Sequence, residues 1–430
     1  MNSYKQMEAA SLSDSQREAL LYLQESNDSV FLTGHAGTGK SFLIKTFLQD
    51  KDQRKAYPVL GSTGVSAFAL GGRTFHSFFG IGMMQGALEA IVARALQNRQ
   101  VRYRLRNAQT IIVDEISMLP SMALECADLI AQAVRESNEP WGGLRVIAVG
   151  DFAQLPPVSH ASQRPWAFLA PTWERTGFVP LILTDQQRTE SPVFLSVLEK
   201  VRLGCVDDEV QDFIFARMID EPLDHATHLY PRRTMADDHN AIKLSKLEQK
   251  LYTFETKYTG SEMYQEALKK NAPVAEVLQV CLGARVMVRI NDPLLRYVNG
   301  SIGVVAGISE DKIVVDIKGR LFDFEKMSFS WLDGDGKPQA TATNFPLQLA
   351  WATTVHKAQG LTLDQLVVDL HALWEPGHAY VALSRVRDPS MLSILRSSAS
   401  SIKADTLVKK FYDGGCASDF QNKLMYSQEE

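Results

Sequence analysis

The sequence predicts an α/β protein with more than one domain, and three features of the chain support this prediction. Over the first 185 residues, short apolar runs alternate with helical stretches, which is typical of a largely parallel sheet covered by helices. Residues 284–324 instead contain four short β-type runs, which indicate a small barrel. After Phe345 the α/β pattern returns. We therefore expect two α/β lobes, the second interrupted by a β-rich insertion.

Local patterns predict the elements of the first lobe. A helix is expected to begin at Ser13, because Gln16 stands three residues later in a capping-box arrangement. Between helical stretches such as Met122–Arg135, short apolar runs predict strands at Val30–Thr33, Pro58–Leu60, Thr110–Val113, Leu144–Val149 and Val179–Leu183. A further amphipathic helix over Val193–Leu203 is expected to end at Gly204.

The β-rich insertion is predicted from closely spaced runs at Ala284–Ile290, Ser301–Ile308, Lys312–Ile317 and Leu321–Phe324. Between the first two runs, the pair Asn299–Gly300 is a strong turn signal. Strand candidates at Leu366–Leu370 and Met391–Leu395 then mark the return of the second lobe.

Composition excludes several classes of protein. The net charge of −5 argues against a coat that binds duplex DNA by bulk electrostatics, but not against a motor that contacts a few phosphates. No run of 18 or more apolar residues occurs, and Met1–Ala10 resembles neither a signal peptide nor a presequence. The four cysteines are scattered, which argues against structural zinc and disulfides. We expect a cytoplasmic protein with no membrane segment.

The strongest motif is Gly34–Ser41 (GHAGTGKS), which fits GxxxxGK[ST] between a predicted strand and a predicted helix. Its glycines, with the residues between them, allow backbone N–H groups to surround phosphates at a helix N-terminus. Lys40 is expected to contact the β- and γ-phosphates of ATP and Ser41 to bind Mg²⁺, with Gly37, Thr38 and Gly39 completing the loop. A chance match is the alternative, but the flanking strand and helix favour a phosphate site.

A second element, Thr110–Glu115 (TIIVDE), places two carboxylates at the end of a predicted strand. Ligands of open parallel sheets bind at this edge. Asp114 is therefore a candidate Mg²⁺ ligand, and Glu115 is a candidate general base for the attacking water. A solvated loop start is the ordinary interpretation of such a pair, but its position after a phosphate loop favours catalysis.

Further motifs resemble those of a helicase superfamily that includes RecD and Dda. In chain order they are GDFAQLPP at Gly150–Pro157, TVHKAQG at Thr354–Gly360 and YVALSR at Tyr380–Arg385, which resemble motifs III, V and VI. The stretches Ala133–Gly143 and Leu349–Ala352 resemble signature regions of the Pif (petite integration frequency) type. This resemblance covers roughly Ser13 to Phe411.

The resemblance implies two RecA-like P-loop lobes that bind ATP between them. We expect residues 1–185 to form the first lobe, with a small wedge insertion near 80–90. The second lobe is expected to contain residues 186–245 and 345–430, and residues 246–344 to form an SH3-like β-barrel insertion.

By the same resemblance, several residues are expected to contact ATP. Gln16 matches an adenine-contacting glutamine, an assignment compatible with its capping role, and Gln154 matches the glutamine beside the γ-phosphate. Arg188 and Arg385 match two arginines that approach the phosphates across the cleft, where cations stabilise the charge of the transferred group. Thr189 departs from the glutamine common in the family after the first arginine. Gly360, at the end of motif V, is a further candidate.

The resemblance also implies a single-stranded DNA site without sequence readout. The candidates are Thr63, Gly64, His76, Phe78, Pro157, Thr354, His356 and Lys357. For Phe78 a core position is the alternative to base stacking, and for the two histidines a structural hydrogen bond is the alternative. Arg94–Arg106 is the most basic segment, and both a solvated helix face and a backbone contact remain open for it.

The resemblance therefore implies a 5′-to-3′ DNA helicase that uses ATP and Mg²⁺ on single strands and forks. Replication, repair, recombination or telomere-type maintenance is the expected setting, in the nucleoid, by a monomer. G-quadruplexes and RNA–DNA hybrids are further candidate substrates. The alternatives are a RecD-like motor subunit of a nuclease complex, a P-loop kinase or ATP-gated regulator, and a degenerate helicase that only coats DNA.

Overall fold

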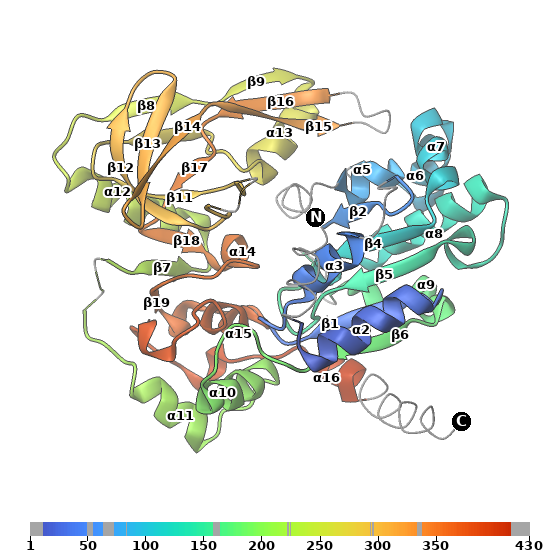
Figure 1. Cartoon of the computed structure of the whole chain (residues 1–430), viewed down its shortest axis with the longest axis horizontal. Coiled ribbons are helices and arrows are strands. Elements are labelled where there is room, and N and C mark those ends of the chain that lie inside the picture. The colour runs from blue at the N-terminus through green and yellow to red at the C-terminus, as the bar shows by residue number, and fades with distance from the viewer. Residues whose placement is uncertain are drawn as a thin grey trace. The chain divides into compact units, whose positions relative to one another are not determined.

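The chain forms two compact units in a computed structural model (Figure 1). The structure describes residues 12–49, 55–62, 73–82, 84–157, 164–221, 223, 225–292, 294, 296–332 and 338–413. The first unit contains the described residues as far as Cys205 and returns at Lys403 for the end of the chain. The second unit contains those from Val206 to Ile402.

A six-stranded parallel sheet organises the first unit, as expected from the sequence. Its strand order is β3-β2-β4-β5-β1-β6, and every neighbouring pair is parallel. The strands are β1 (Val30–Gly34), β2 (Val59–Gly61), β3 (Arg73–Thr74), β4 (Thr110–Asp114), β5 (Arg145–Val149) and β6 (Val179–Leu183).

The two faces of this sheet are buried by different sets of helices, because side chains alternate along each strand. Val30 and Leu32 of β1 pack with α2 (Asp14–Glu25) and α3 (Lys40–Gln49) on one face. Phe31 belongs to the larger core on the other face. The helices of that face are α5 (Phe75–Phe79), α6 (Leu88–Gln97), α7 (Arg99–Asn107), α8 (Ser121–Arg135), α9 (Pro171–Thr176) and α16 (Thr406–Phe411).

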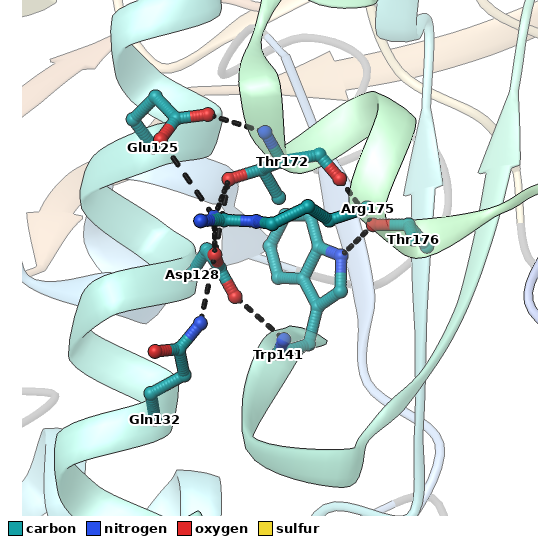
Figure 2. Close-up of polar contacts among 7 residues, drawn as sticks. All are labelled: Glu125, Asp128, Gln132, Trp141, Thr172, Arg175 and Thr176. Carbon is teal, nitrogen blue, oxygen red and sulfur yellow. Dashed lines mark hydrogen bonds and ion pairs between the residues drawn. The ribbon is translucent and has the colours of Figure 1, made fainter. Parts of the chain in front are cut away.

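A buried carboxylate ties three helical segments of this face together (Figure 2). Asp128 of α8 has no exposed surface and accepts a hydrogen bond from the backbone N–H of Trp141 at 2.6 Å. Its other oxygen accepts from Thr172 at 3.0 Å and from Arg175 at 2.5 Å, both on α9, and from Gln132. We call Asp128 and these four partners the Asp128 cluster.

The stretch that resembles a Pif signature has a structural role in this unit. Its end forms η2 (Pro140–Gly143), in which the Trp141 side chain is buried and donates to Thr176 Oγ1 at 2.9 Å. A Cβ atom on Gly142 would lie 2.6 Å from the carbonyl oxygen of Ala131, so only glycine permits this approach to α8. Arg135 then donates to the Gly142 carbonyl at 2.7 Å.

A four-stranded parallel sheet organises the α/β part of the second unit, in the order β18-β7-β19-β20. The strands are β7 (Thr227–Tyr230), β18 (Ala352–Thr354), β19 (Leu366–Val368) and β20 (Leu392–Ile394). Its helices are α11 (Asp208–Phe215), α12 (Arg233–Ser245), α14 (Val355–Ala358) and α15 (His378–Leu383). With the first sheet, this sheet gives the two RecA-like lobes that were predicted.

The insertion in the second unit is rich in antiparallel strands (Figure 1). A five-stranded sheet contains, in order, β14 (Arg320–Glu325), β13 (Lys312–Ile317), β12 (Ile302–Ile308), β11 (Arg285–Val288) and β17 (Leu347–Leu349). The four predicted β runs and the Asn299–Gly300 turn are therefore confirmed. Around it lie β8 (Tyr252–Glu255) with β10 (Val277–Val280), β9 (Lys257–Gly260) with β15 (Met327–Leu332) and β16 (Pro338–Asn344), and α13 (Glu262–Asn271). Closure into an SH3-like barrel stays a prediction.

Within the part of the chain that the structure describes, no helix is both long and apolar enough to cross a membrane.

Candidate nucleotide site and nucleic-acid contacts

The phosphate loop lies between β1 and α3, as the sequence predicted. Lys40 Nζ donates to the carbonyl oxygens of Gly34 at 2.8 Å and His35 at 3.0 Å, so its ammonium group lies across the loop. Burial lowers the pKa of Lys40, and the carboxylates of Asp151 and Glu115 oppose this shift. The loop therefore carries a positive charge, which the nearby carboxylates partly balance. Such a site suits the phosphates of a nucleoside triphosphate.

Gln16 has two partners, and both bear on its predicted role. Its Oε1 accepts from the backbone N–H of Ser13 at 3.1 Å, which confirms the capping box. Its Nε2 donates to the Thr38 carbonyl in the phosphate loop at 2.9 Å. A Cβ atom on Gly39 would lie 2.4 Å from this Nε2 atom, so the contact requires glycine there. Gln16 is thus placed beside the loop, and its contact with adenine stays a prediction.

The Asp114–Glu115 pair ends β4 and carries strained backbone. Glu115 has φ +55°, in the left-handed region, and its N–H donates to Asp114 Oδ1 at 3.0 Å. Burial and the neighbouring Glu115 raise the pKa of Asp114 to about 7. A buried carboxyl group beside a like charge is stabilised by a dication, so Asp114 together with Ser41 fits Mg²⁺.

No cluster of three or more His, Cys, Asp or Glu side chains suited to a metal ion occurs among the described residues.

Motif III begins at the end of β5, the neighbour of β1. Asp151 has no exposed surface and forms an ion pair with Arg202 at 2.9 Å. Burial by itself would raise the pKa of Asp151, but Arg202 and Lys40 hold it at about 2. The Asp151 carbonyl accepts from the Gln154 N–H at 3.0 Å, and its carboxylate accepts from the Ala153 N–H at 3.1 Å. This turn sets the position of the buried Gln154.

Arg188 lies in the same unit as the phosphate loop. A Cβ atom on Gly37 would lie 2.6 Å from Arg188 Cβ, so the arginine packs directly against the loop. We expected residues 186–245 to belong to the second lobe, whereas the first compact unit extends to Cys205. Arg188 therefore approaches the loop within one unit, and its contact with phosphate stays a prediction.

Arg385 belongs to the second unit and is almost fully buried, with 1% of its surface exposed. Its guanidinium donates to the carbonyl of Val381 at 2.7 Å and to those of Ala358 and Leu361 at 3.3 Å. These carbonyls belong to α15 and to the end of motif V, where Gly360 has φ +77°. The proposed roles of Arg385 and Gly360 in ATP hydrolysis stay predictions.

Three predicted DNA contacts lie together at the N-terminus of α14 in the second unit. Thr354 caps this helix, and its Oγ1 accepts from the Lys357 N–H at 3.2 Å. His356 and Lys357 both reach solvent, although the surrounding protein atoms partly desolvate the imidazole ring and the ammonium group. Burial lowers the pKa of His356, and it lowers the pKa of Lys357 to about 8 with help from Arg289 and Arg233. Lys357 thus lies among cations, as expected for a site that binds an anion.

Phe78 is a correction. It is only 3% exposed and packs in the core of the first unit with Phe75 and Phe79, so its ring offers no face on which a base could stack. The alternative of a core position is therefore right for Phe78, and Phe75 and Phe79 are buried beside it. Arg104, in the basic segment, donates to the Phe78 carbonyl at 2.7 Å and thereby has a structural role.

Of the four remaining candidates for DNA contact, the structure describes His76 and Pro157. His76 on α5 is half-buried, and burial lowers its pKa to about 4, so it is a neutral hydrogen-bonding group near pH 7. Pro157 is buried at the end of motif III. Thr63 and Gly64 lie outside the described residues.

Sequence reasoning missed two residues beside the nucleotide loop. Arg202 ends α10 (Pro192–Arg202) and pairs with Asp151, and Tyr412 follows α16 and donates to the same carboxylate at 3.0 Å. Asp151 was part of a recognised motif but had no assigned role. Nothing in the spacing of Arg202 or Tyr412 along the chain signals the contact.

The two parallel sheets, the phosphate loop and the carboxylate pair define a P-loop nucleotide-binding protein with RecA-like lobes. A family model described as PIF1-like helicase matches residues 11–212. The chain is 47% identical to the ATP-dependent DNA helicase Pif1 of Bdellovibrio bacteriovorus, over 93% of this chain and 91% of that protein. The chain belongs to the PIF1-like helicase family.

Other relatives agree. The human ATP-dependent DNA helicase PIF1 is 36% identical over 92% of this chain, which spans only 63% of the human protein. The Pif1 helicase structure from Candida albicans matches with a TM-score of 0.81 and 31% identity, over 94% of this chain and 99% of that chain. A Bacteroides Pif1 structure in complex with ADP-AlF3 and ssDNA matches with a TM-score of 0.68 and 29% identity, over 94% and 98%.

Proposed function

We propose that this protein is an ATP-dependent DNA helicase that moves 5′-to-3′ along single-stranded DNA and unwinds duplexes. The observation that carries the proposal is the convergence of Lys40, Gln16, Arg188 and the Asp151 turn on one phosphate loop. A DNA strand in the related Bacteroides complex and the helicase names of the relatives support the nucleic-acid part.

In the proposed reaction, the loop N–H groups and Lys40 bind the phosphates of ATP. Mg²⁺ at Ser41 and Asp114 would supply charge neutralisation of the phosphate oxygens. Glu115 orients the attacking water and accepts its proton, because it follows Asp114 directly at the strand end. Gln154 contacts the γ-phosphate, and Arg188 and Arg385 stabilise the charge that develops on the transferred group.

The nucleic-acid part of the proposal rests on α14. A helix N-terminus with a threonine cap, an exposed histidine and a lysine of lowered pKa suits a backbone phosphate, and such contacts position a strand without reading its sequence. Thr63, Gly64, His76 and Pro157 are the further proposed contacts. The wedge near residues 80–90 is proposed to separate the strands.

The finer assignments belong to the same proposal. We place the protein in the nucleoid-associated cytoplasm as a monomer, active in replication, repair, recombination or telomere-type maintenance. Single strands and forks are its proposed substrates, with G-quadruplexes and RNA–DNA hybrids as further ones.

The test is ATP hydrolysis by the purified chain with and without single-stranded DNA, followed by unwinding of matched 5′- and 3′-tailed duplexes. Strong stimulation by DNA and unwinding of only the 5′-tailed duplex are expected. Unwinding of only the 3′-tailed duplex would overturn the direction. Hydrolysis that ignores DNA would overturn the helicase assignment, and a chain inactive without other subunits would favour a RecD-like motor subunit.

A further inference from the structure

A second layer of residues lies behind the phosphate loop, and it gathers on the carboxylate of Asp151. The Oδ1 atom accepts from Arg202 Nη2 at 2.9 Å, from the Tyr412 hydroxyl at 3.0 Å and from the Ala153 N–H at 3.1 Å. The Arg202 guanidinium also lies over the Tyr412 ring, 4.4 Å from its centroid. We call Asp151, Arg202, Tyr412 and Thr33 the Asp151 cluster.

The Tyr412 hydroxyl joins two neighbouring strand ends. It has one proton, which it donates to Asp151, and it accepts from the backbone N–H of Phe152 at 3.0 Å. Thr33 Oγ1 lies 3.3 Å away and must therefore be the donor of that third contact. Thr33 directly precedes Gly34 of the phosphate loop at the end of β1, whereas Phe152 belongs to motif III after β5.

These contacts fix the turn that carries Gln154. The turn is closed by the Asp151 carbonyl and the Gln154 N–H, and the Asp151 carboxylate holds it from inside through the Ala153 N–H. With all of these partners in place, the Gln154 backbone has a set position relative to the end of β1. Loss of the Tyr412 hydroxyl would leave the Phe152 N–H and the Thr33 hydroxyl without this shared partner.

The same cluster adjoins two places where the chain enters or leaves the first unit. Arg202 shortly precedes the end of the unit at Cys205, and Tyr412 follows its return at Lys403. These two passages are adjacent, because a Cβ atom on Gly204 would lie 2.8 Å from the backbone nitrogen of Ala404. Arg202 thus connects the first passage to the Asp151 carboxylate, which holds motif III, and Tyr412 connects the second passage to the same group.

We propose that Tyr412 and Arg202 are positioning residues for ATP hydrolysis, which hold the Asp151 turn so that Gln154 meets the γ-phosphate. This inference rests on the proposed function. It assigns a role in hydrolysis to α16 and the residue after it, at the end of the described chain, where no helicase motif was found.

The test is Tyr412→Phe, which removes the hydroxyl and keeps the ring. The kcat of DNA-stimulated ATP hydrolysis should fall by about tenfold, as for loss of an outer support of a catalytic group, with KM for ATP nearly unchanged. The affinity for ADP–aluminium fluoride, which mimics the transferred phosphoryl group, should fall similarly while the affinity for ADP stays constant. A merely structural role would weaken both nucleotides alike.

Tyr22→Phe is the matched control, because its hydroxyl also donates to an aspartate of the first unit, Asp28, at 2.7 Å. It should leave hydrolysis and both affinities unchanged. Arg202→Lys, which keeps the charge but loses the paired guanidinium contacts, should act in the same direction as Tyr412→Phe and serves if that variant does not fold.

A double-mutant cycle tests whether Tyr412 affects ATP hydrolysis through Gln154. If Tyr412 acts through Gln154, then Gln154→Ala and the Gln154→Ala/Tyr412→Phe double variant should bind ADP–aluminium fluoride equally. Additive losses, or equal losses for ADP and ADP–aluminium fluoride, would overturn the inference while the wild type remains an active DNA-stimulated ATPase. A wild type without that activity would instead overturn the proposed function.

Discussion

Two aspartates of the first unit, Asp128 and Asp151, are equally buried but differ in what surrounds them. Neither carboxylate has exposed surface, and each forms an ion pair with one arginine. The side chain of Arg175, the partner of Asp128, is 50% exposed, whereas that of Arg202 is only 9% exposed. Water can thus replace part of the first interaction and almost none of the second.

The neighbours of the two carboxylates differ more than the pairs themselves. The Asp128 cluster joins α8 to η2 and α9, all of them elements of the core (Figure 2). Asp151 instead adjoins the phosphate loop, where its charge opposes the lowering of the Lys40 pKa. A buried Asp–Arg pair therefore indicates function only when its neighbours belong to a site.

Lys357 in the second unit extends the comparison to a cation whose neighbours are mainly other cations. Burial lowers its pKa to about 8, and Arg289 and Arg233 lower it further than the single opposing carboxylate, Asp237, restores it. A DNA phosphate would supply the missing negative charge, which distinguishes this group from both aspartates.

The largest effect is expected at Glu115. Its variant should give the lowest rate of ATP hydrolysis, with which variants of the Asp128 and Asp151 clusters can be compared. Glu115→Gln should lower kcat for ATP hydrolysis by roughly a thousandfold, because it removes the general base and keeps the shape of the side chain. ATP binding should persist, measured by fluorescence of a labelled nucleotide. Glu125→Gln, on α8 in the same unit, is the control and should remain active. Normal turnover in Glu115→Gln would refute the base assignment.

The next largest effect is expected for Asp151→Asn. It leaves the Arg202 charge buried and unpaired, which should lower the free energy of unfolding by roughly 3–5 kcal/mol. Hydrolysis should fall by at least about tenfold with it, because the turn of Gln154 loses its charged acceptor. Urea unfolding and steady-state ATPase assays measure the two effects. A fully active variant would remove Asp151 from the description of the nucleotide site.

The pH dependence of DNA binding tests the contrast with Lys357. Its pKa lies below that of a free lysine, so the ammonium loses its proton as pH rises through 8. Affinity for single-stranded DNA should therefore fall by about tenfold between pH 7 and pH 9, in fluorescence anisotropy titrations at constant salt. Lys357→Arg, charged throughout this range, should bind with much less change. Equal slopes for both proteins would exclude Lys357 as the titrating contact.

The smallest effect is expected for Asp128→Asn. Asparagine keeps the size of the side chain and one acceptor oxygen, but its NH2 group takes the place of an oxygen that accepts from donors. Because Arg175 regains water, the free energy of unfolding should fall by only about 1–3 kcal/mol. ATP hydrolysis should stay within about twofold of the wild type, since the cluster lies in the core and not at the loop. A loss of activity comparable with that of Asp151→Asn, at equal folded fraction, would abolish the distinction between the two clusters.

Much of the candidate site could be predicted because its parts are local in sequence. The phosphate loop needs consecutive residues between one strand and one helix, and Asp114 and Glu115 follow their strand directly. The capping box of Gln16 spans a single helical turn. Patterns of this kind are visible in the chain because short-range geometry determines them.

Other assignments depended on packing and could not be settled in advance. Phe78 stood in a motif that suggested base stacking, but the helices of the first unit bury it at 3% exposure. Arg188 was expected in the second lobe, but the first unit extends to Cys205 and therefore contains it. Its side chain packs against Gly37. In both cases burial and neighbours were decisive, and neither is encoded in the spacing of residues.

The sequence alone determined the parallel α/β class, the phosphate loop and the carboxylate pair, because hydrophobic period and backbone geometry act over a few residues. Only the tertiary structure brought Asp151 together with Arg202 and Tyr412, which are 51 and 261 positions away along the chain. Contacts over such separations arise from the folding of whole elements against one sheet, and a buried charge finds its partner only when that fold is complete.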